Sequence, residues 1–295
     1  MINLFLTILF TSWLLISFRL FSAYKVNQLQ AISINYMVCM VLGVVFADNL
    51  RLIQTLDSVE PWMYLAWLTG AFFLPTFFLM SYTVEKVSLT ISSIASKTSL
   101  IIPVSVSILF LSKDEPFTVL NFIGLGIGLI AILLSSVKKT STASNNEKPS
   151  TFVYFLPFLV FLGGGMVDVL INITNTLFLP KAYSGLFPLF AFSVAAIAGF
   201  IVLCYRLICK NEKITLKNCF AGVVLGIPNY LSIFFLLKAL QDFNNNGAVI
   251  FPILNIAVIL VTASVALLVL KEKLSLYNYI GLGLAVLSLG LILAS

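Results

Sequence analysis

The sequence predicts an all-α membrane protein with ten transmembrane helices, arranged as two five-helix repeats of inverted topology. Of the 295 residues, 60% are hydrophobic and only 9% are charged, whereas soluble domains carry about 25% charged residues. The apolar residues come in runs of about 20, which is the length that spans a bilayer as a helix. With a mean hydropathy of +1.09, this much apolar surface cannot be hidden inside one water-soluble globule.

Each apolar run is expected to form a helix, because lipid offers no hydrogen-bond partners to the backbone of a single strand. The first run lacks the basic start and the small-residue cleavage site of a signal peptide, so we expect it to be retained as a helix. The ten runs cover residues 2–18, 30–47, 61–82, 88–111, 117–136, 152–177, 183–208, 218–240, 247–270 and 275–294.

The polar segment 137–151 separates a predicted first domain, 1–136, from a second, 152–295, with five runs in each. Its Ser, Thr and Asn content is typical of a flexible linker. The halves share a motif at a separation of 157 residues (272 − 115): Glu115 and Glu272 each precede an asparagine by six residues, and Ile-Gly-Leu-Gly follows. Because five is an odd number, the second copy must enter the membrane from the opposite side. Inverted repeats of this kind are typical of secondary transporters, whose substrate site lies near the midplane between the halves.

The chain resembles the drug/metabolite transporter superfamily, in its EamA-type branch. The resemblance is carried by the five-plus-five duplication and by the turn Glu272-Lys273-Leu274-Ser275 before the glycine-rich last run, which Glu115-Pro116-Phe117-Thr118 matches in part. It extends over essentially the whole chain and implies a small-metabolite permease, in a family that carries amino acids, sugars, nucleotide conjugates and drugs. The second half departs from the pattern, since Leu260 stands at the place of Pro103. A kink in the ninth helix is therefore expected elsewhere.

Two charged residues lie inside the predicted spans, Lys97 in the fourth and Asp168 in the sixth. A charge at mid-bilayer costs at least about 2.5–3.5 kcal/mol, so such residues normally face a cavity or a partner. Asp168, Asn172 and Asn175 share one helical face by their spacing, which we interpret as a cavity wall; the alternative is a buried hydrogen-bond network between helices. Lys97 lies beside Ser96 in a stripe of small polar residues, and its alternative is snorkelling to the interface. From the helical rise, the two charges differ in depth by about 10 Å, which allows either a strained ion pair or a bridge by water or substrate.

Other polar residues inside the spans complete the predicted substrate site. Pro228 and Pro252 precede two of them and can free backbone carbonyl groups, and interrupted helices of this kind often mark binding sites in transporters. The additional site residues are Asn35, Tyr36, Asn229, Tyr230 and Asn255.

The glycine and glutamate motifs are interpreted as structural. Gly124 and Gly128 lie four residues apart in an apolar run, as do Gly281 and Ala285. Small residues at this spacing let helices approach closely, so we expect helix packing rather than nucleotide binding. Glu115 and Glu272 are each expected to cap the following helix or to pair with a neighbouring lysine.

The composition argues against enzymatic chemistry. The absence of histidine excludes Ser-His-Asp and Cys-His nucleophilic sites as well as His-ligated zinc and haem. The four cysteines have no CxxC spacing and are expected to be free thiols, and no P-loop is present. We therefore expect no enzyme, no metal and no cofactor. The net charge of +6 resides in loops between the runs, where it fits lipid headgroups rather than nucleic acid.

The prediction is a secondary transporter, a permease or exporter, that moves a small organic metabolite across the cytoplasmic (inner) membrane by alternating access. Asp168 is the candidate for proton coupling, and we expect a monomer rather than a homodimer. The alternative is an ion-translocating or structural subunit of a larger membrane complex. Loops after the odd-numbered runs carry twelve basic residues against four on the other side, so the charge rule places the linker in the cytoplasm and both termini outside. The family resemblance implies the reverse, and orientation stays open.

Overall fold

The computed structural model describes residues 2–46, 49–54, 56, 58–106, 118–136, 151–243 and 247–294. These residues form helices joined by short connections. Two helices end in a π-helical turn, η2 (Thr174–Phe178) after α8 and η4 (Val265–Val269) after α11, and η3 (Lys181–Tyr183) is a short 3₁₀ turn. The α-helices are α1 (Ile2–Ala23), α2 (Gln28–Val45), α3 (Asn49–Ile53), α4 (Pro61–Lys86), α5 (Leu89–Thr98), α6 (Ile101–Val106), α7 (Val119–Ser136), α8 (Thr151–Ile173), α9 (Leu186–Cys209), α10 (Leu216–Asp242), α11 (Gly247–Ser264) and α12 (Leu276–Leu293).

Six of the described helices are long and apolar enough to cross a membrane: α1, α2, α4, α8 with η2, α9 and α10. Shorter apolar stretches occur in α7, in α11 with η4, and in α12. Large apolar side chains also cover the outside of these helices; Phe220, for example, is 71% exposed. Such a surface is stable against lipid and not against water. The protein is therefore a multi-pass integral membrane protein.

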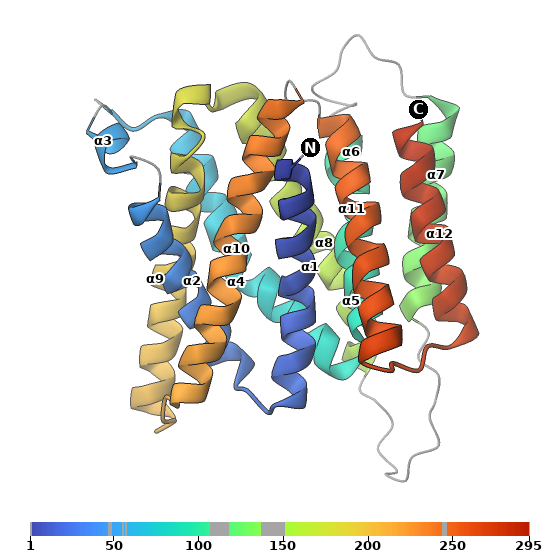
Figure 1. Ribbon diagram of the computed structural model, residues 1–295, viewed down its shortest axis with the longest axis horizontal. Helices are drawn as coiled ribbons and strands as arrows, with labels where there is room; N and C mark the ends of the chain where they lie inside the picture. The colour runs from blue at the N-terminus through green and yellow to red at the C-terminus, as the bar shows by residue number, and fades with distance from the viewer. Residues whose placement is uncertain are drawn as a thin grey trace.

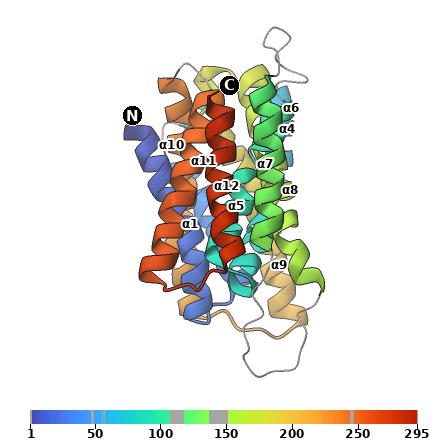
Figure 2. The same ribbon diagram turned by 90° about the vertical axis from the view of Figure 1, so that its right-hand side faces the viewer.

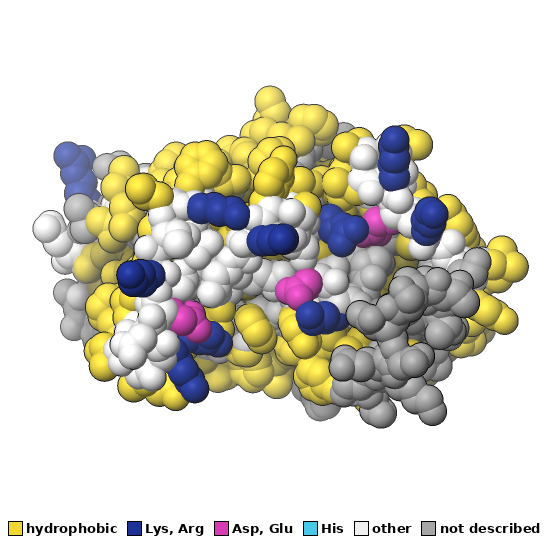
Figure 3. Space-filling model, turned by 90° about the horizontal axis from the view of Figure 1, so that it is seen from below, with side chains coloured by type: hydrophobic (Ala, Val, Ile, Leu, Met, Phe, Trp, Pro, Cys, Tyr) yellow, Lys and Arg dark blue, Asp and Glu magenta, His cyan; other side chains and the backbone are white. Residues whose placement is uncertain are grey.

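The helices stand side by side, and the described chain begins and ends at the same end of the bundle, the upper one in Figure 1. α7 and α12 pack together at one side, and α2 packs with α9 and α10 at the other. α1, α4, α5, α8 and α11 lie between these two groups, as the second view also shows (Figure 2). Lys and Arg side chains spread over the lower face (Figure 3).

Glycines allow the closest helix contacts. A Cβ on Gly70 of α4 would collide with the backbone carbonyl oxygen of Ala191 in α9. In the pair α7 and α12, a Cβ on Gly128 would collide with Ile101 and come within 2.8 Å of the Ser288 Oγ. That hydroxyl donates a 2.6 Å hydrogen bond to the carbonyl oxygen of Gly124. On α12, Gly281 is buried.

Helices lie within every predicted apolar run, but the run 88–111 is broken. α5 ends at Thr98 and α6 begins at Ile101. Pro103 has no N–H to donate to the Ser99 carbonyl oxygen, so the N–H of Ile102 donates to it instead, at 2.9 Å. The interruptions expected at the other prolines do not occur, because α10 continues through Pro228 and α11 through residue 252.

The partner predicted for Glu272 is wrong. Ser275 caps α12, in a reciprocal capping box with Asn278. Glu272 turns away from α12 and accepts hydrogen bonds from the backbone N–H groups of Leu89 and Thr90, at the start of α5. Its equivalent Glu115 and the linker residues 137–150 lie outside the described residues; Thr151, predicted to end the linker, begins α8.

Candidate functional site

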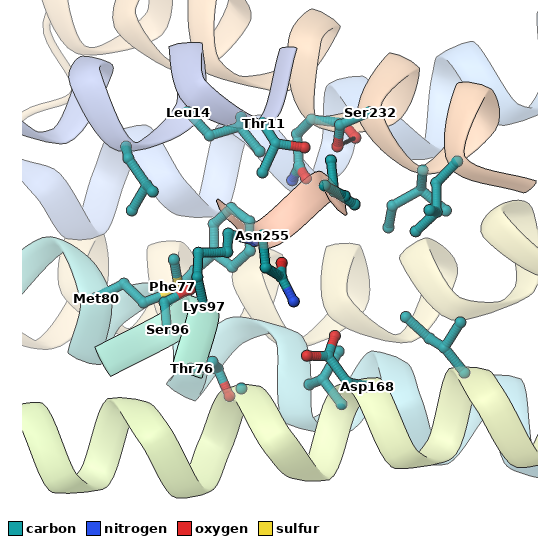
Figure 4. A pocket seen from close by; sticks show the side chains of 18 of the residues that line it. Thr11, Leu14, Thr76, Phe77, Met80, Ser96, Lys97, Asp168, Ser232 and Asn255 are labelled. Atoms are coloured by element: carbon teal, nitrogen blue, oxygen red, sulfur yellow. Dashed lines mark hydrogen bonds between the residues drawn. The ribbon is translucent and has the colours of Figure 1, made fainter. Parts of the chain in front are cut away.

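A cavity of about 130 Å³ lies in the middle of the bundle, between α1, α4, α5, α8, α10 and α11. Its wall combines apolar side chains with two opposite charges, hydroxyl groups and amides. The close-up shows these polar groups around a common space (Figure 4). The polar lining residues are Thr11, Thr76, Ser96, Lys97, Asp168, Asn229, Ser232 and Asn255.

Asp168 and Lys97 are the two charged residues of this wall. Asp168 projects from α8, and Lys97 stands in the last turn of α5. Each is half-buried, because it borders the cavity. Among the described residues the two form no ion pair within 4.0 Å, although they interact electrostatically. The cationic side chain of Lys97 is favourably placed at the end of a helix, where the backbone dipoles present partial negative charge.

Only a weak contact holds the carboxylate of Asp168. The Ser99 Oγ lies 3.4 Å from the Asp168 Oδ2 and 2.5 Å from the carbonyl oxygen of Ser96. A hydroxyl group has one proton, and it serves the shorter contact. The carboxylate is therefore available to a cation that enters the cavity.

Three consecutive glycines bring α8 close to this site. A Cβ on Gly163 would lie 2.9 Å from the Thr76 Oγ1, and one on Gly164 would lie 3.0 Å from the Ser99 Oγ. A Cβ on Gly165 would collide with Ile102 in α6. The absence of side chains therefore places the broken segment directly against the helix that carries Asp168.

Two amides of the second half complete the wall. The side chain of Asn255 points across the cavity toward Asp168 (Figure 4). The Asn229 amide nitrogen donates to the Asn35 Oδ1 at 3.1 Å, and the Ser232 hydroxyl donates to the carbonyl oxygen of Asn229 at 2.8 Å. Asn229 is thus fixed by protein contacts, whereas the Asn255 side chain faces the cavity.

The structure brings some of the predicted site residues together and leaves others outside the cavity. Ser96, Lys97, Asp168, Asn229 and Asn255 line it. On α8 the lining residues are Gly164, Val167, Asp168 and Ile171, which recur at three- and four-residue spacing along one helical face. Five predicted residues are not among those that line the cavity: Asn35, Tyr36, Asn172, Asn175 and Tyr230.

Tyr36 and Tyr230 belong to the helix packing instead. Both are fully buried. The Tyr36 hydroxyl donates to the carbonyl oxygen of Phe73 at 2.9 Å, and its ring stacks on the Phe73 ring. Tyr230 packs against Phe46, Phe192 and Phe234.

Sequence reasoning assigned no role to Thr11, Thr76 and Ser232, which also line the cavity. A signal existed for Thr11, since Thr7 and Thr11 lie four residues apart in an otherwise apolar run. The aromatic part of the wall comes from Phe73, Phe77 and Phe251. Aromatic residues in spans are usually packing residues, so composition alone did not separate them from the lipid-facing ones.

The described residues contain no cluster of three or more metal-ligating acidic or cysteine side chains. All four cysteines are free thiols. The chemistry available at the cavity is thus ionic and hydrogen-bonding recognition together with apolar contact.

Comparisons with known proteins establish relationship and fold. The chain is 29% identical over 208 residues to an uncharacterized protein of Haemophilus influenzae strain Rd, a match that covers 70% of this chain and 67% of that protein. It also resembles a protein of known crystal structure with a TM-score of 0.57 and 14% sequence identity, over 98% of this chain and 94% of the other. At that identity the likeness concerns the fold alone. No family model matches the chain.

Proposed function

We propose that this protein is a secondary transporter of the drug/metabolite type, which moves a small organic solute across the cytoplasmic membrane by alternating access. The observation that carries the proposal is the pair Lys97 and Asp168, two charges within the membrane-spanning bundle that face one cavity without pairing. Unpaired charges are expensive inside a membrane and are retained where they bind or conduct something.

The repeat supports the proposal, because equivalent positions of the two halves line the same cavity. A separation of 157 residues relates four such pairs, and each half contributes one member to each. The pairs are Thr11 with Asp168, Leu14 with Ile171, Thr76 with Ile233, and Lys97 with Leu254.

Helix packing agrees with ten spans in two inverted halves. Counterpart helices pack on each other in three places: α2 on α9, α5 on α11 and α7 on α12. α1 begins near the end of α10, where Asn3 donates to Asp242, and ends near the end of α11, where Arg19 pairs with Glu272. A twofold axis in the membrane plane would produce these pairings, and transporter sites lie at such axes.

The cavity fits a small solute that carries both a positive and a negative group. Asp168 would bind the cationic group and Lys97 the anionic group, with Asn255 between them. The apolar remainder would contact Phe77, Val167 and their neighbours on the wall. The cavity has a volume of about 130 Å³, so the solute must be small.

Asp168 also offers a coupling mechanism. Its carboxylate can hold either a proton or the cationic group of the solute, but not both. A proton gradient would then drive solute exchange, because protonation from one side releases the solute on that side. This is proton-coupled alternating access with one shared residue.

The test compares three ligands with the same apolar group in a thermal-unfolding assay of the purified protein. Leucine carries both charges, 3-methylbutylamine only the positive one, and 4-methylpentanoate only the negative one. A bound ligand at one hundred times its Kd stabilises the folded state by about 2.7 kcal/mol. We expect leucine to raise the Tm more than either analogue. Equal shifts for the three ligands, or none, would contradict the assignment.

A further inference from the structure

We infer that Glu272 is the latch that holds the lower side of the cavity closed, by fastening the start of α5 to the opposite half of the protein. This inference rests on the proposed transport function. It goes beyond the binding site, because Glu272 lies at the lower face and is not among the residues that line the cavity.

α5 is the plug between the cavity and the lower face. Its ten residues begin at the lower end with Leu89, and Ser96 and Lys97 reach the cavity. Each residue from Leu89 to Ser96 is buried, with at most 6% exposure. These two turns lie on the lower side of the cavity, so in the proposed cycle α5 moves when a solute leaves downward.

The first turn of α5 depends on Glu272 for its hydrogen bonds. The N–H of Leu89 donates to the Glu272 Oε1 at 3.0 Å, and the N–H of Thr90 lies 3.5 Å from the Oε2. The Thr90 hydroxyl donates to the same Oε2 at 3.3 Å. The third N–H of this first turn, that of Ile91, has no partner within the helix backbone and donates to the Ser88 Oγ. A carboxylate at the start of a helix also faces the positive end of the helix dipole.

The carboxylate is held in place from the other side. Glu272 follows Lys271, whose φ of 52° is in the left-handed region, and its own N–H donates to the carbonyl oxygen of Ala266. Arg19 at the end of α1 approaches the Glu272 Oε1 to 3.6 Å. The Glu272 side chain is only 5% exposed, so water screens these contacts little.

One further bond fastens α5 to the same neighbour. The hydroxyl groups of Ser93 and Thr262 lie 2.6 Å apart and are fully enclosed between α5 and α11. Above this bond, α5 ends at the break after Thr98. The plug is therefore a short rigid helix with the latch at its lower end and Lys97 at its upper end. A solute that displaces Lys97 would therefore also displace the first turn of α5 and weaken its hydrogen bonds to Glu272.

The test measures access to the cavity with Ser96→Cys, in a protein whose four natural cysteines have been replaced. The protein is reconstituted into vesicles of known orientation. A small, membrane-impermeant cationic methanethiosulfonate is then added from one side at a time, and the rate at which it labels the new thiol is measured. We expect Glu272→Gln to raise the labelling rate from the lower side about tenfold and to lower the rate from the upper side, since loss of one charge-assisted hydrogen bond shifts an equilibrium by about that factor. Arg19→Gln should act in the same direction with a smaller factor.

Glu212→Gln is the matched control. Glu212 lies on the same face and pairs with Arg206 at 2.5 Å. Its other oxygen accepts from the Asn27 amide nitrogen at 3.5 Å, at the start of α2 and not of α5. Its loss should leave labelling from both sides within about twofold of the parent. Glu272→Asp retains the charge on a shorter arm and should fall between the parent and Glu272→Gln. Size-exclusion chromatography shows whether each variant is folded; should Glu272→Gln aggregate, Arg19→Gln and Glu272→Asp decide.

The outcomes separate the latch from transport itself. If the parent is labelled from both sides and a monodisperse Glu272→Gln protein gives the same rates, the latch is overturned while alternating access stands. If the reagent reaches the cysteine from the lower side in no variant, alternating access fails, and the latch with it. A change in Glu212→Gln as large as in Glu272→Gln would also overturn the assignment to Glu272.

Discussion

α5 with α6 and the uninterrupted α11 occupy equivalent places in the proposed repeat, yet they differ in shape and in chemistry. The first is broken between Thr98 and Ile101 and presents Lys97 to the cavity. α11 runs without interruption from Gly247 to Ser264, and Leu254 stands at the position equivalent to Lys97, 157 residues later (254 − 97). Both residues line the same cavity.

The difference in helix continuity follows from one residue, which is proline in the first segment and leucine in the second. Pro103 in the first half corresponds to Leu260 in the second. Leucine retains the N–H that continues a helix, whereas proline removes it and loosens the turn before it. The broken helix ends beside Lys97, and a cation is stabilised at a helix end. In the proposed repeat, the charged residue Lys97 therefore lies in the half whose backbone is interrupted.

The largest expected effect concerns the pair Thr11 and Asp168, which are equivalent in the repeat. Asp168→Asn should leave the protein inserted and folded but reduce proton-driven leucine uptake into proteoliposomes at least tenfold, because an amide cannot exchange a proton. Thr11→Val should change uptake less than threefold. Proton-driven uptake that survives in Asp168→Asn would remove the assignment of coupling.

The second prediction makes the two segments alike in charge. Lys97→Leu copies the residue of α11 and should weaken leucine binding about 30- to 100-fold, as loss of a desolvated charge pair costs about 2–3 kcal/mol. Isothermal titration of the purified protein measures the Kd. Leu254→Met alters the wall without altering charge and serves as the control. A Kd in Lys97→Leu within threefold of the parent would show that the ammonium group does not contact the ligand.

The third prediction concerns the contact of α8 with the broken segment. Gly165→Ala should destabilise the protein by about 1–3 kcal/mol, because the new methyl group would collide with Ile102. Gly283→Ala in α12 is the matched control: no atom lies within 4 Å of its Cβ position, and alanine is favoured in helices by about 0.5–1 kcal/mol. The Tm in detergent measures both, and similar values for the two variants would mean that α8 does not rest on α6.

The smallest effect is expected from repairing the break. Pro103→Leu restores an N–H that can donate to the carbonyl oxygen of Ser99, so we expect slower hydrogen exchange at residues 99–103 and a several-fold weaker affinity for leucine. Mass spectrometry of the exchanged protein measures the first effect. Unchanged exchange at these residues would show that proline is not the cause of the interruption.

The apolar runs predict where the helices lie, because burial in lipid requires long stretches of apolar residues and intact backbone hydrogen bonds. The unfavourable energy of a charge in lipid likewise predicted that Lys97 and Asp168 face a cavity. The break after Thr98 was not predicted, because other prolines, such as Pro75, Pro157 and Pro228, lie in spans whose helices continue. Asn172 and Asn175 were expected beside Asp168 because the prediction used only the spacing of polar residues. On α8 the cavity is lined on the side of Val167 and Ile171, and Asp168 stands at the edge of that face. The partner of Glu272 depends on contacts between distant segments, which spacing along the chain does not contain.

The interrupted backbone beside Lys97 has a thermodynamic consequence. Neither the peptide groups at the gap nor the neighbouring ammonium and carboxylate groups can remain dry at low energy, so we expect water to fill the site when no solute is bound. Recognition is then an exchange of ordered water for solute. Osmolytes too large to enter should strengthen binding as they lower water activity, and the slope of that dependence counts the molecules expelled.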